Sequence, residues 1–302
     1  MKLSSSDIAT IVKGKLTGSP ELMVNDIVTD TRQLSFVEGL LFFALRGKNH
    51  DGHNFIENLY KKGIRVFVVE KLPIDHNSYL GAAFIKTGNT VEALQLLASY
   101  KRKAFKSTVI GVTGSTGKTV VKEWLADILG LTTSVIRSPK SYNSQIGVPL
   151  SVWKLDDKYK MGIFEAGISL PGEMDKLQQV IDPDIGVITN LGDAHRENFL
   201  DDKTKAEEKL KLFINSSLIV YCRDYDIIHQ SIIKNKVFNS KKLVDWSCEN
   251  DSAKVFVKKS SVPGGRTRIN IRFNGNVNTF EIPFSDRASV ENAITVAVVC
   301  LA

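Results

Sequence analysis

The sequence predicts an α/β protein with two domains, a small N-terminal α/β domain over residues 1–105 and a central domain over residues 106–302. The central domain is expected to have a mostly parallel sheet with a small antiparallel β extension. Three observations lead to this prediction. The chain of 302 residues is long enough for about two domains. From residue 107 onward, short apolar runs alternate with helical patterns, as in a parallel sheet covered on both faces. After about residue 240, turn residues separate apolar strands instead.

In the N-terminal domain, apolar runs bounded by turn residues indicate strands, and capping side chains indicate the starts of helices. The expected strands cover residues 39–47, 64–70 and 82–86. The expected helices cover residues 4–14, which serine caps, residues 51–62, which the Asp51-Gly52-His53 stretch caps, and residues 89–104, which start at Asn89.

The central domain is predicted from the same signals. Its strands are expected at 107–113, 132–138, 160–166, 184–190 and 217–222, and its helices near 118–129, 145–153, 171–181, 203–214 and 225–236. Antiparallel strands are expected at 255–257, 268–273 and 279–282, joined by glycine- and asparagine-rich turns. Asp286 is expected to cap an apolar helix that runs to Ala302 without a stop signal, so we expect that the sequence ends inside a longer protein.

Composition narrows the class of protein. The hydrophobic fraction of 43% and the charged fraction of 24% are ordinary for a globular chain. Cys222, Cys248 and Cys300 lie far apart without a C-x-x-C pair, so neither a disulfide framework nor a zinc ribbon is indicated, and a reducing compartment is expected. The sequence has no signal-peptide core and no apolar run of membrane-spanning length. We therefore expect a cytoplasmic protein with no membrane partner.

The net charge of +7 has two interpretations. The densest cluster, Lys101-Arg102-Lys103, is either a nucleic-acid contact or a solvated helix end before the next strand. We favour the helix end and expect no nucleic-acid partner. The basic balance also suits a small molecule that carries several phosphates.

Residues 111–119 read GVTGSTGKT and lie between an apolar run and a helical pattern. This is the context of a phosphate-binding loop, because glycines let the backbone turn tightly and aim N–H groups at phosphate oxygens. Val112 stands where the strict motif has glycine, and an ordinary glycine-rich loop is the alternative. We expect nucleotide binding, with Lys118 at the β- and γ-phosphates and the Thr119 hydroxyl on Mg²⁺. The expected contacts are Gly114, Ser115, Thr116, Gly117, Lys118 and Thr119.

Three further candidates each have a plain structural alternative. Glu165 ends an apolar run and is either a metal-binding acid or a helix-capping or loop residue. His195 follows the next strand, and a lone histidine is more often structural than a ligand. Lys209 is by default a solvated helix lysine paired with nearby acids.

Asn190 and Asp193 have the spacing of a guanine-reading N-K-x-D motif. Leu191 stands where that motif has its lysine, which weakens the interpretation as a GTPase.

Four motifs occur in order at suitable spacing: TGSTGKT at 113–119, YNSQIGVP at 142–149, FEAG at 164–167 and NLGDAHRENF at 190–199. Together they resemble the Mur ligases of peptidoglycan synthesis, and within that family the branch that adds a dipeptide. The front of the chain agrees, since residues 30–32, 39–47 and 51–53 resemble the UDP-binding domain of these ligases. The resemblance covers essentially the whole sequence.

The resemblance implies an ATP-dependent amide ligase that uses ATP and Mg²⁺. Such enzymes phosphorylate the terminal carboxylate of UDP-N-acetylmuramoyl-tripeptide, and the amine of D-Ala-D-Ala then attacks the acyl phosphate to give an amide, ADP and phosphate. A carboxylate that attacks a polyanion needs charge neutralisation more than it needs a base.

The resemblance also implies roles for particular residues. The expected catalytic residues are Lys118, Glu165, His195 and Lys209, the last of them carbamylated. The expected metal ligands are Thr119, Glu165, His195 and Lys209. Asn292 is expected near adenine, and Asn143 is expected to contact the nucleotide or the muramoyl substrate. The expected substrate-binding residues are Thr31, Arg32, Gly47, Asp51, His53 and Asn143.

The sequence departs from the family pattern in three respects. Phe199-Leu200-Asp201 stands where the family has Phe-Gly-Ser after the metal-binding histidine. Residues 286–289 read DRAS where the family has Gly-Arg-His-Asn, and the third domain, which binds the incoming amine, is not in the sequence. We therefore expect little turnover from this chain alone. Residues 286–292 resemble versions fused to alanine racemase, so fused ligase and racemase domains are expected beyond residue 302. The alternatives are another Mur ligase, a folylpolyglutamate-type ligase, which usually lacks the front domain, or a non-catalytic nucleotide-binding module.

Overall fold

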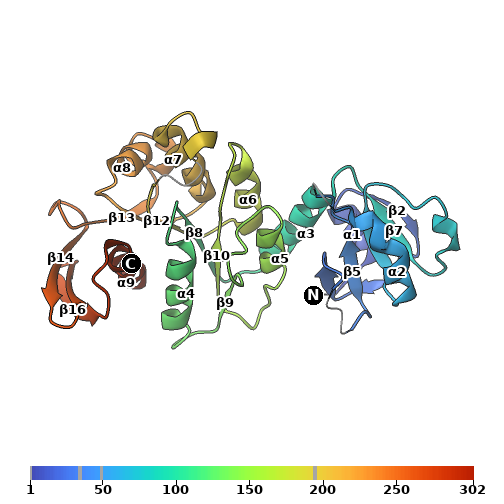
Figure 1. Ribbon diagram of the computed structural model, residues 1–302, viewed down its shortest axis with the longest axis horizontal. Coiled ribbons are helices and arrows are strands. Elements are labelled where there is room, and N and C mark those ends of the chain that lie inside the picture. The colour runs from blue at the N-terminus through green and yellow to red at the C-terminus, as the bar shows by residue number, and fades with distance from the viewer. Residues whose placement is uncertain (1, 33–35, 48–49, 193–195) are drawn as a thin grey trace. The chain divides into compact units, whose positions relative to one another are not determined.

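The computed structural model describes residues 2–32, 36–47, 50–192 and 196–302, which divide into two compact units (Figure 1). The front unit comprises Met1–Ala104 together with Val152–Asp156, and the central unit comprises Phe105–Ser151 together with Asp157–Ala302. Both units are mixed α/β with mostly parallel strands, and the nine-stranded sheet of the central unit ends in an antiparallel group, so the predicted fold class is confirmed. Among the described residues, every helix is too short or too polar to cross a membrane.

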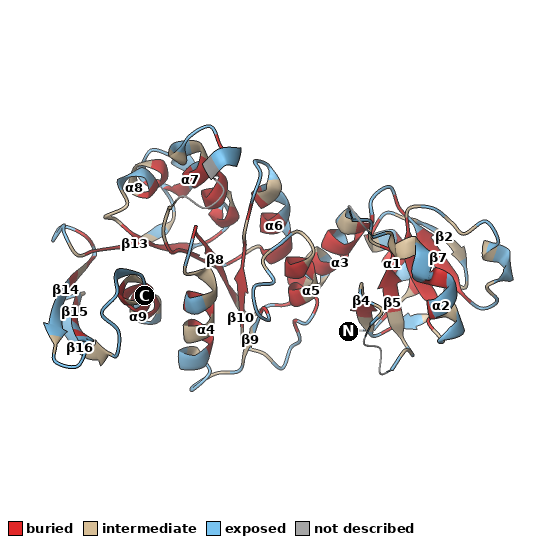
Figure 2. Cartoon of the chain, in the orientation of Figure 1, coloured by how far each residue is buried: buried red, intermediate tan, exposed pale blue. Residues whose placement is uncertain are grey.

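The front unit is built on a five-stranded sheet with the order β2-β7-β6-β5-β4. Strands β4 to β7 are parallel neighbours, and β2 runs antiparallel to β7. The bounds of the strands are β1 Leu3–Ser4, β2 Lys15–Gly18, β3 Met23–Val24, β4 Asp26–Val28, β5 Leu40–Phe43, β6 Val66–Val69 and β7 Ala83–Lys86. The bounds of the helices are α1 Ser5–Ile11, η1 Gly52–Phe55, α2 Ile56–Lys61, η2 His76–Ser78 and α3 Thr90–Ala104. Strand β6 is buried at all four positions, as expected for a parallel strand covered on both faces (Figure 2).

The segment Val152–Asp156 packs within the front unit although it follows α5 in the chain. The indole Nε1 of Trp153 donates a hydrogen bond of 3.1 Å to Asp26 Oδ1, and Lys154 Nζ lies 2.6 Å from Asp26 Oδ2. Nothing in the local sequence signals these contacts, because their partner lies more than a hundred residues earlier in the chain.

The central unit is built on a nine-stranded sheet with the order β16-β15-β14-β13-β12-β11-β8-β10-β9. The pairs from β9 to β14 are parallel, and β14, β15 and β16 form antiparallel pairs. The bounds of the strands are β8 Thr108–Thr113, β9 Val135–Arg137, β10 Met161–Glu165, β11 Ile185–Ile188, β12 Leu218–Cys222, β13 Lys242–Ser247, β14 Val255–Val262, β15 Arg266–Phe273 and β16 Asn276–Ile282.

Helices cover both faces of the parallel part of this sheet (Figure 1). Helices α4 and α9 pack on one face, where their apolar side chains join the main core cluster. The short helix η4 and helix α8 pack on the other face, beside α6 and α7. The bounds of the helices are α4 Lys118–Leu129, α5 Gly147–Val152, α6 Glu173–Ile181, η3 Arg196–Asn198, α7 Asp202–Leu210, η4 Lys211–Phe213, α8 Asp226–Ile233, η5 Lys236–Phe238 and α9 Arg287–Leu301.

Several predicted bounds need correction. The first helix ends at Ile11, not residue 14, and the strand expected at 39–47 is limited to Leu40–Phe43. Asp51 caps a 3₁₀ turn, which continues into α2, because its carboxylate accepts a hydrogen bond from the His53 amide. Asp286 caps α9, as predicted. The antiparallel extension is present as predicted, and it continues the parallel sheet because β14 pairs with β13.

Candidate functional site

The phosphate loop connects β8 to α4 at the carboxyl edge of the sheet, where ligands of parallel sheets bind. Gly114 is buried with φ +143°, and Gly117 adopts a left-handed conformation with φ +78° immediately before the helix. A Cβ atom at Gly114 would lie 2.0 Å from Thr189 Oγ1, and one at Gly117 would lie 2.3 Å from Asn292 Oδ1. Both positions therefore require glycine, which allows the loop to pack tightly against two other elements.

Lys118 is folded back over this loop. Its Nζ donates hydrogen bonds of 3.0 Å to the Gly114 carbonyl and 3.1 Å to the Ser115 carbonyl. Burial lowers the pKa of Lys118, and the charge of Glu165 opposes that shift. Lys118 is also the first residue of α4. An anion bound at this loop would contact both its ammonium group and the backbone N–H groups at the N-terminus of the helix.

Asn190 and Thr189, at the end of the neighbouring strand β11, hold the loop in place. Asn190 Oδ1 accepts from the Thr116 amide at 2.9 Å, and Asn190 Nδ2 donates to Thr116 Oγ1 at 2.8 Å. Thr189 Oγ1 donates to the Thr116 carbonyl at 2.6 Å. Both polar atoms of the Asn190 side-chain amide thus form hydrogen bonds with the loop, which explains the position of this residue without any guanine contact. Asp193, the other residue of that motif, lies outside the described residues.

Glu165 ends β10, the strand on the other side of β8, and its carboxylate is completely buried. Its Oε1 accepts a hydrogen bond of 3.0 Å from Asn143 Nδ2. Its Oε2 lies 3.6 Å from Nζ of Lys122, which is also completely buried, and it has no hydrogen-bond partner among the described residues. The carboxylate is therefore fixed through one oxygen and can still bind a ligand through the other. These contacts do not match the helix-capping alternative.

Lys209 lies in α7 and is only 3% exposed, which excludes the alternative of a solvated helix lysine. Its Nζ donates a hydrogen bond of 3.1 Å to the Gly114 carbonyl, which also accepts from Lys118. Burial, together with the charges of Lys118 and Lys205, lowers the pKa of Lys209 to about 7. Helix α7 reads as polar all round in the sequence, and its buried face becomes apparent only from the contacts with the loop.

The pKa of Lys209 predicts a pH dependence of stability. Between about pH 7 and pH 10, Lys209 is neutral in the folded protein and protonated in the unfolded chain, whose pKa is about 10.4. The unfolded chain then binds more protons, so stability rises with pH by up to about 1.4 kcal/mol per unit. Urea unfolding at pH 7, 8 and 9 should show this rise in the unmodified chain and a flatter profile in Lys209→Met. Parallel profiles would contradict the lowered pKa.

A cavity of about 260 Å³ lies at this edge of the central unit. Its lining combines the phosphate loop with polar groups that follow β9 and β10, and it includes Gly114, Ser115, Lys118, Asn143, Gln145, Glu173 and Lys209. A second cavity of about 450 Å³, between α4, α9 and the hairpin strands, is lined almost entirely by apolar side chains. The polar cavity is the better candidate for a phosphate-bearing ligand, because it alone of the two presents lysines and loop amides.

The remaining central candidates fall around the same loop. Thr119 lies half-buried in the first turn of α4. Asn292, in α9, packs against Gly117. His195 lies outside the described residues.

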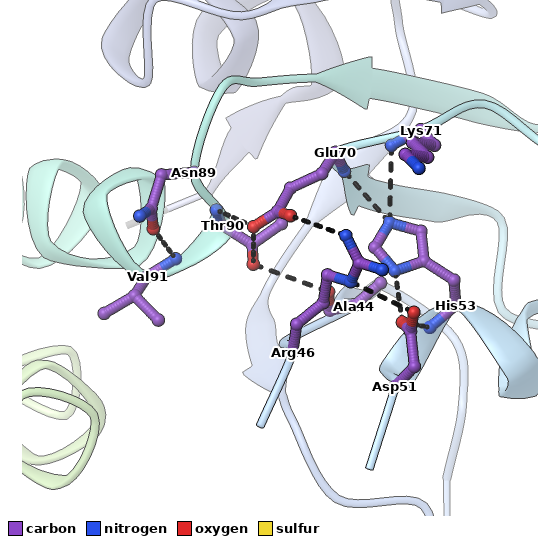
Figure 3. Close-up of polar contacts among 9 residues, drawn as sticks. All are labelled: Ala44, Arg46, Asp51, His53, Glu70, Lys71, Asn89, Thr90 and Val91. Carbon is purple, nitrogen blue, oxygen red and sulfur yellow. Dashed lines mark hydrogen bonds and ion pairs between the residues drawn. The ribbon is translucent and has the colours of Figure 1, made fainter. Parts of the chain in front are cut away.

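In the front unit, the predicted substrate residues gather at the carboxyl ends of β4 and β5. Thr31 and Arg32 follow β4, and the Arg32 guanidinium binds Asp30 with Nη2 to Oδ2 at 2.6 Å, which lowers the pKa of Asp30 to about 2. Gly47 follows β5, and its amide donates to the His50 carbonyl at 2.8 Å. Asp51 and His53 form a hydrogen-bonded pair close by (Figure 3). This edge is the candidate site of the front unit.

Comparison with known proteins identifies the family. Residues 112–300 match the Mur ligase middle domain, and residues 24–102 match the Mur ligase family catalytic domain. The chain belongs to the Mur ligase family. The family predicted from the four motifs is therefore confirmed.

Two curated relatives of this Mur ligase chain carry the name UDP-N-acetylmuramoyl-tripeptide–D-alanyl-D-alanine ligase. The Buchnera aphidicola protein is 34% identical over 295 residues, which cover 92% of this chain and 62% of the relative. The Bacillus subtilis protein is 31% identical over 304 residues, which cover 97% of this chain and 62% of the relative. The Mur ligase chain thus spans about 62% of the length of these relatives.

Solved structures share the fold of this Mur ligase chain. A crystal structure of MurF from Acinetobacter baumannii has a TM-score of 0.88 at 23% identity and covers 100% of this chain and 65% of that protein. The structure of MurF from Thermotoga maritima in complex with ADP has a TM-score of 0.78 at 25% identity and covers 92% and 62% of the two chains.

Sequence reasoning missed two residues of the central site in this Mur ligase chain. Lys122 was not singled out, although it lies four residues after Lys118 and so shares a helix face with it. Thr189 carried no signal, since its hydroxyl acts only through the fold. Asn190 was noticed for its spacing, but its role in holding the loop comes from the neighbouring strands β11 and β8.

Proposed function

We propose that the protein takes part in peptidoglycan precursor synthesis as an ATP-dependent ligase that adds D-Ala-D-Ala to UDP-N-acetylmuramoyl-tripeptide through an acyl phosphate. The central unit binds ATP, and the front unit binds the UDP-linked substrate. The observation that carries the proposal is the polar cavity, where the phosphate loop, Asn143 and Lys209 line one pocket in a chain of the Mur ligase family. Asn143 in turn binds the buried Glu165 carboxylate. The names of the relatives support this choice of substrates.

In this proposal, the chain's own groups position phosphates and offset their charge. Residues 114–119 bind the ATP phosphates through backbone N–H groups, and Lys118 leaves the loop carbonyls to stabilise the γ-phosphoryl group during transfer. Asn292, which packs against the loop, lies near adenine, and Asn143, which lines the cavity, orients the buried Glu165 carboxylate. Because charge neutralisation dominates phosphoryl transfer, no general base is needed for the first step.

Mg²⁺ fits this site on one structural observation. Glu165 presents a buried carboxylate oxygen without a hydrogen-bond partner among the described residues, and Mg²⁺ prefers such hard oxygen ligands. Within the described ranges no group of three or more His, Cys, Asp or Glu side chains forms a ready metal site. The Thr119 hydroxyl and Glu165 would each hold one Mg²⁺ ion, directly or through water, and His195 would join Glu165 at the second ion. The bound ion supplies neutralisation of phosphate charge.

Lys209 is proposed to carry a carbamate. The neutral amine attacks CO₂, a C–N bond forms, and one proton is released, so a cation becomes an anion that can bind metal. A buried lysine with a lowered pKa supplies the neutral amine that this step needs.

Fused ligase and racemase domains beyond residue 302 stay a prediction from the sequence.

The proposal is tested by calorimetric titration of the chain with UDP-N-acetylmuramoyl-tripeptide. We expect saturable binding that is lost when Thr31→Ala and Arg32→Ala are combined, because both residues lie at the carboxyl edge of the front sheet. Binding of ATP to the double variant should be unchanged. If the unmodified chain binds ATP with Mg²⁺ but no UDP-linked substrate, the ligase assignment fails and a nucleotide-binding module remains.

A further inference from the structure

Described residues on the two sides of the connection between β5 and η1 pair with each other at the candidate substrate edge of the front unit. Arg46 and Asp51 pair as an isolated antiparallel bridge. The Gly47 amide donates to the His50 carbonyl at 2.8 Å, and the Gly52 amide donates to the Leu45 carbonyl at 2.8 Å. The described residues 45–47 and 50–52 thus pair their backbones with each other. Side chains connect this pairing to the neighbouring strand.

His53 supplies that attachment (Figure 3). Its Nδ1 lies 2.6 Å from Asp51 Oδ1, and the same oxygen accepts from the His53 amide at 3.0 Å. Its Nε2 faces two backbone donors beyond the end of β6, the Glu70 amide at 3.0 Å and the Lys71 amide at 3.4 Å. A ring nitrogen that faces two N–H groups must be an acceptor, so the network assigns a neutral ring with its proton on Nδ1.

Charged side chains continue the network on both sides of His53 (Figure 3). Asp51 Oδ2 binds Arg46 Nε at 3.1 Å, and an Arg46 Nη1 lies 3.8 Å from Glu70 Oε2. Glu70 Oε1 accepts from the amide and the hydroxyl of Thr90, at the first residue of α3, and the same hydroxyl lies 3.4 Å from the Ala44 carbonyl. The paired residues Arg46 and Asp51 are therefore linked to the ends of β5 and β6 and to the start of α3.

We propose that His53 is a positioning residue, which in its neutral form fixes the paired residues Arg46 and Asp51 for the UDP-linked substrate and does not itself bind the phosphates. This inference rests on the proposed function and revises the substrate-binding role that the sequence suggests for His53. Both ring nitrogens are already engaged within the protein, and the side chain is only 16% exposed. Residues that are held in place before binding raise the affinity for a ligand, because less conformational entropy is lost when the ligand binds.

The test compares His53→Ala with His53→Gln, because glutamine can offer one donor and one acceptor in place of the two ring nitrogens. His76→Gln is the matched control, since His76 lies in η2 and its Nδ1 lies 3.1 Å from the Pro73 carbonyl oxygen. Affinity for UDP-N-acetylmuramoyl-tripeptide is measured by calorimetry. We expect a loss of about tenfold or more in His53→Ala, recovery to within about threefold in His53→Gln, and no change in the control. Equal losses in the alanine and glutamine variants would overturn the positioning role.

A second readout needs no substrate, so that failure of this inference can be told from failure of the proposed function. Nitrogen chemical shifts of the His53 ring should report the neutral form protonated at Nδ1. Hydrogen exchange should show protected Glu70 and Lys71 amides in the unmodified chain and in His53→Gln, and faster exchange in His53→Ala. A cationic ring, or unprotected amides in the unmodified chain, would overturn the inference even if the substrate binds. Absence of substrate binding with the expected spectra would instead count against the proposed function.

Discussion

Replacement of Lys122 by methionine is expected to lower the free energy of unfolding by about 3–5 kcal/mol, because it leaves the Glu165 carboxylate buried without its ion-pair partner. Lys122 and Glu165 are both 0% exposed, and Nζ lies 3.6 Å from Oε2. The same ammonium donates hydrogen bonds to the carbonyls of Ser138 and Lys140. Its removal therefore leaves two backbone carbonyls, in the segment that leads to Asn143, without their donor. Urea unfolding followed by circular dichroism measures the loss.

The control for this variant is Glu123→Gln. Glu123 is the other carboxylate near Lys122, at 3.0 Å, but its side chain is 33% exposed and also pairs with Arg137. Exposed and half-exposed pairs contribute about 0–1 kcal/mol, so the control should lose little. The double variant Lys122→Met with Glu165→Gln should be more stable than Lys122→Met alone, since it removes the unpaired charge. A Lys122→Met protein as stable as the control would contradict the buried ion pair.

Substitution of Gly114 by alanine is expected to lower the affinity for ATP by about 10- to 100-fold, as strain of roughly 1–3 kcal/mol displaces the phosphate loop. The added Cβ would lie 2.0 Å from Thr189 Oγ1 and 3.1 Å from the Asn190 amide nitrogen, and φ is +143°. Thr189 cannot move aside freely, because its hydroxyl donates to the Thr116 carbonyl. The loop itself must therefore shift, and with it the N–H groups that face the phosphates.

Gly192→Ala is the matched change for the same assay. A Cβ atom at Gly192 would meet only Ser115 Cβ at 3.7 Å, an ordinary contact, and the position has no left-handed φ. Affinity for ATP, measured by calorimetry, should be unchanged in this variant. Similar losses in both glycine variants would show that the effect does not come from the loop geometry.

The parts of the fold that could be predicted are those with local signals. The sequence on the two sides of the phosphate loop predicts a strand, a turn and a helix by itself. Strand β8 and helix α4 lie where they are expected. Strand β13 was missed because buried polar residues interrupt its apolar run. Asp245 and Ser247 are buried there, and Asp245 pairs with Arg223 at 3.3 Å. An ion pair with a residue more than twenty positions away has no signature in the strand itself.

The candidate site shows the same limit more sharply. That Glu165 and the phosphate loop meet could be expected, because both follow neighbouring strands of a parallel sheet. That Lys209 is buried could not, because α7 is rich in charge and its contact with Gly114 joins residues 95 positions apart. Spacing suggested a base-reading role for Asn190, and only the contacts with Thr116 show that its amide holds the loop.

The central claim is that the cavity beside β8 binds ATP together with Mg²⁺. The most direct measurement is calorimetric titration of the 302-residue chain with ATP, with Mg²⁺ and with a chelator, in parallel with Lys118→Met. We expect one saturable site in the unmodified chain and weaker binding of ATP without Mg²⁺. Lys118→Met should lose about tenfold or more in affinity for ATP, with an unchanged free energy of unfolding. Binding of ATP that is indifferent to both Mg²⁺ and Lys118, or no binding at all, would contradict this claim.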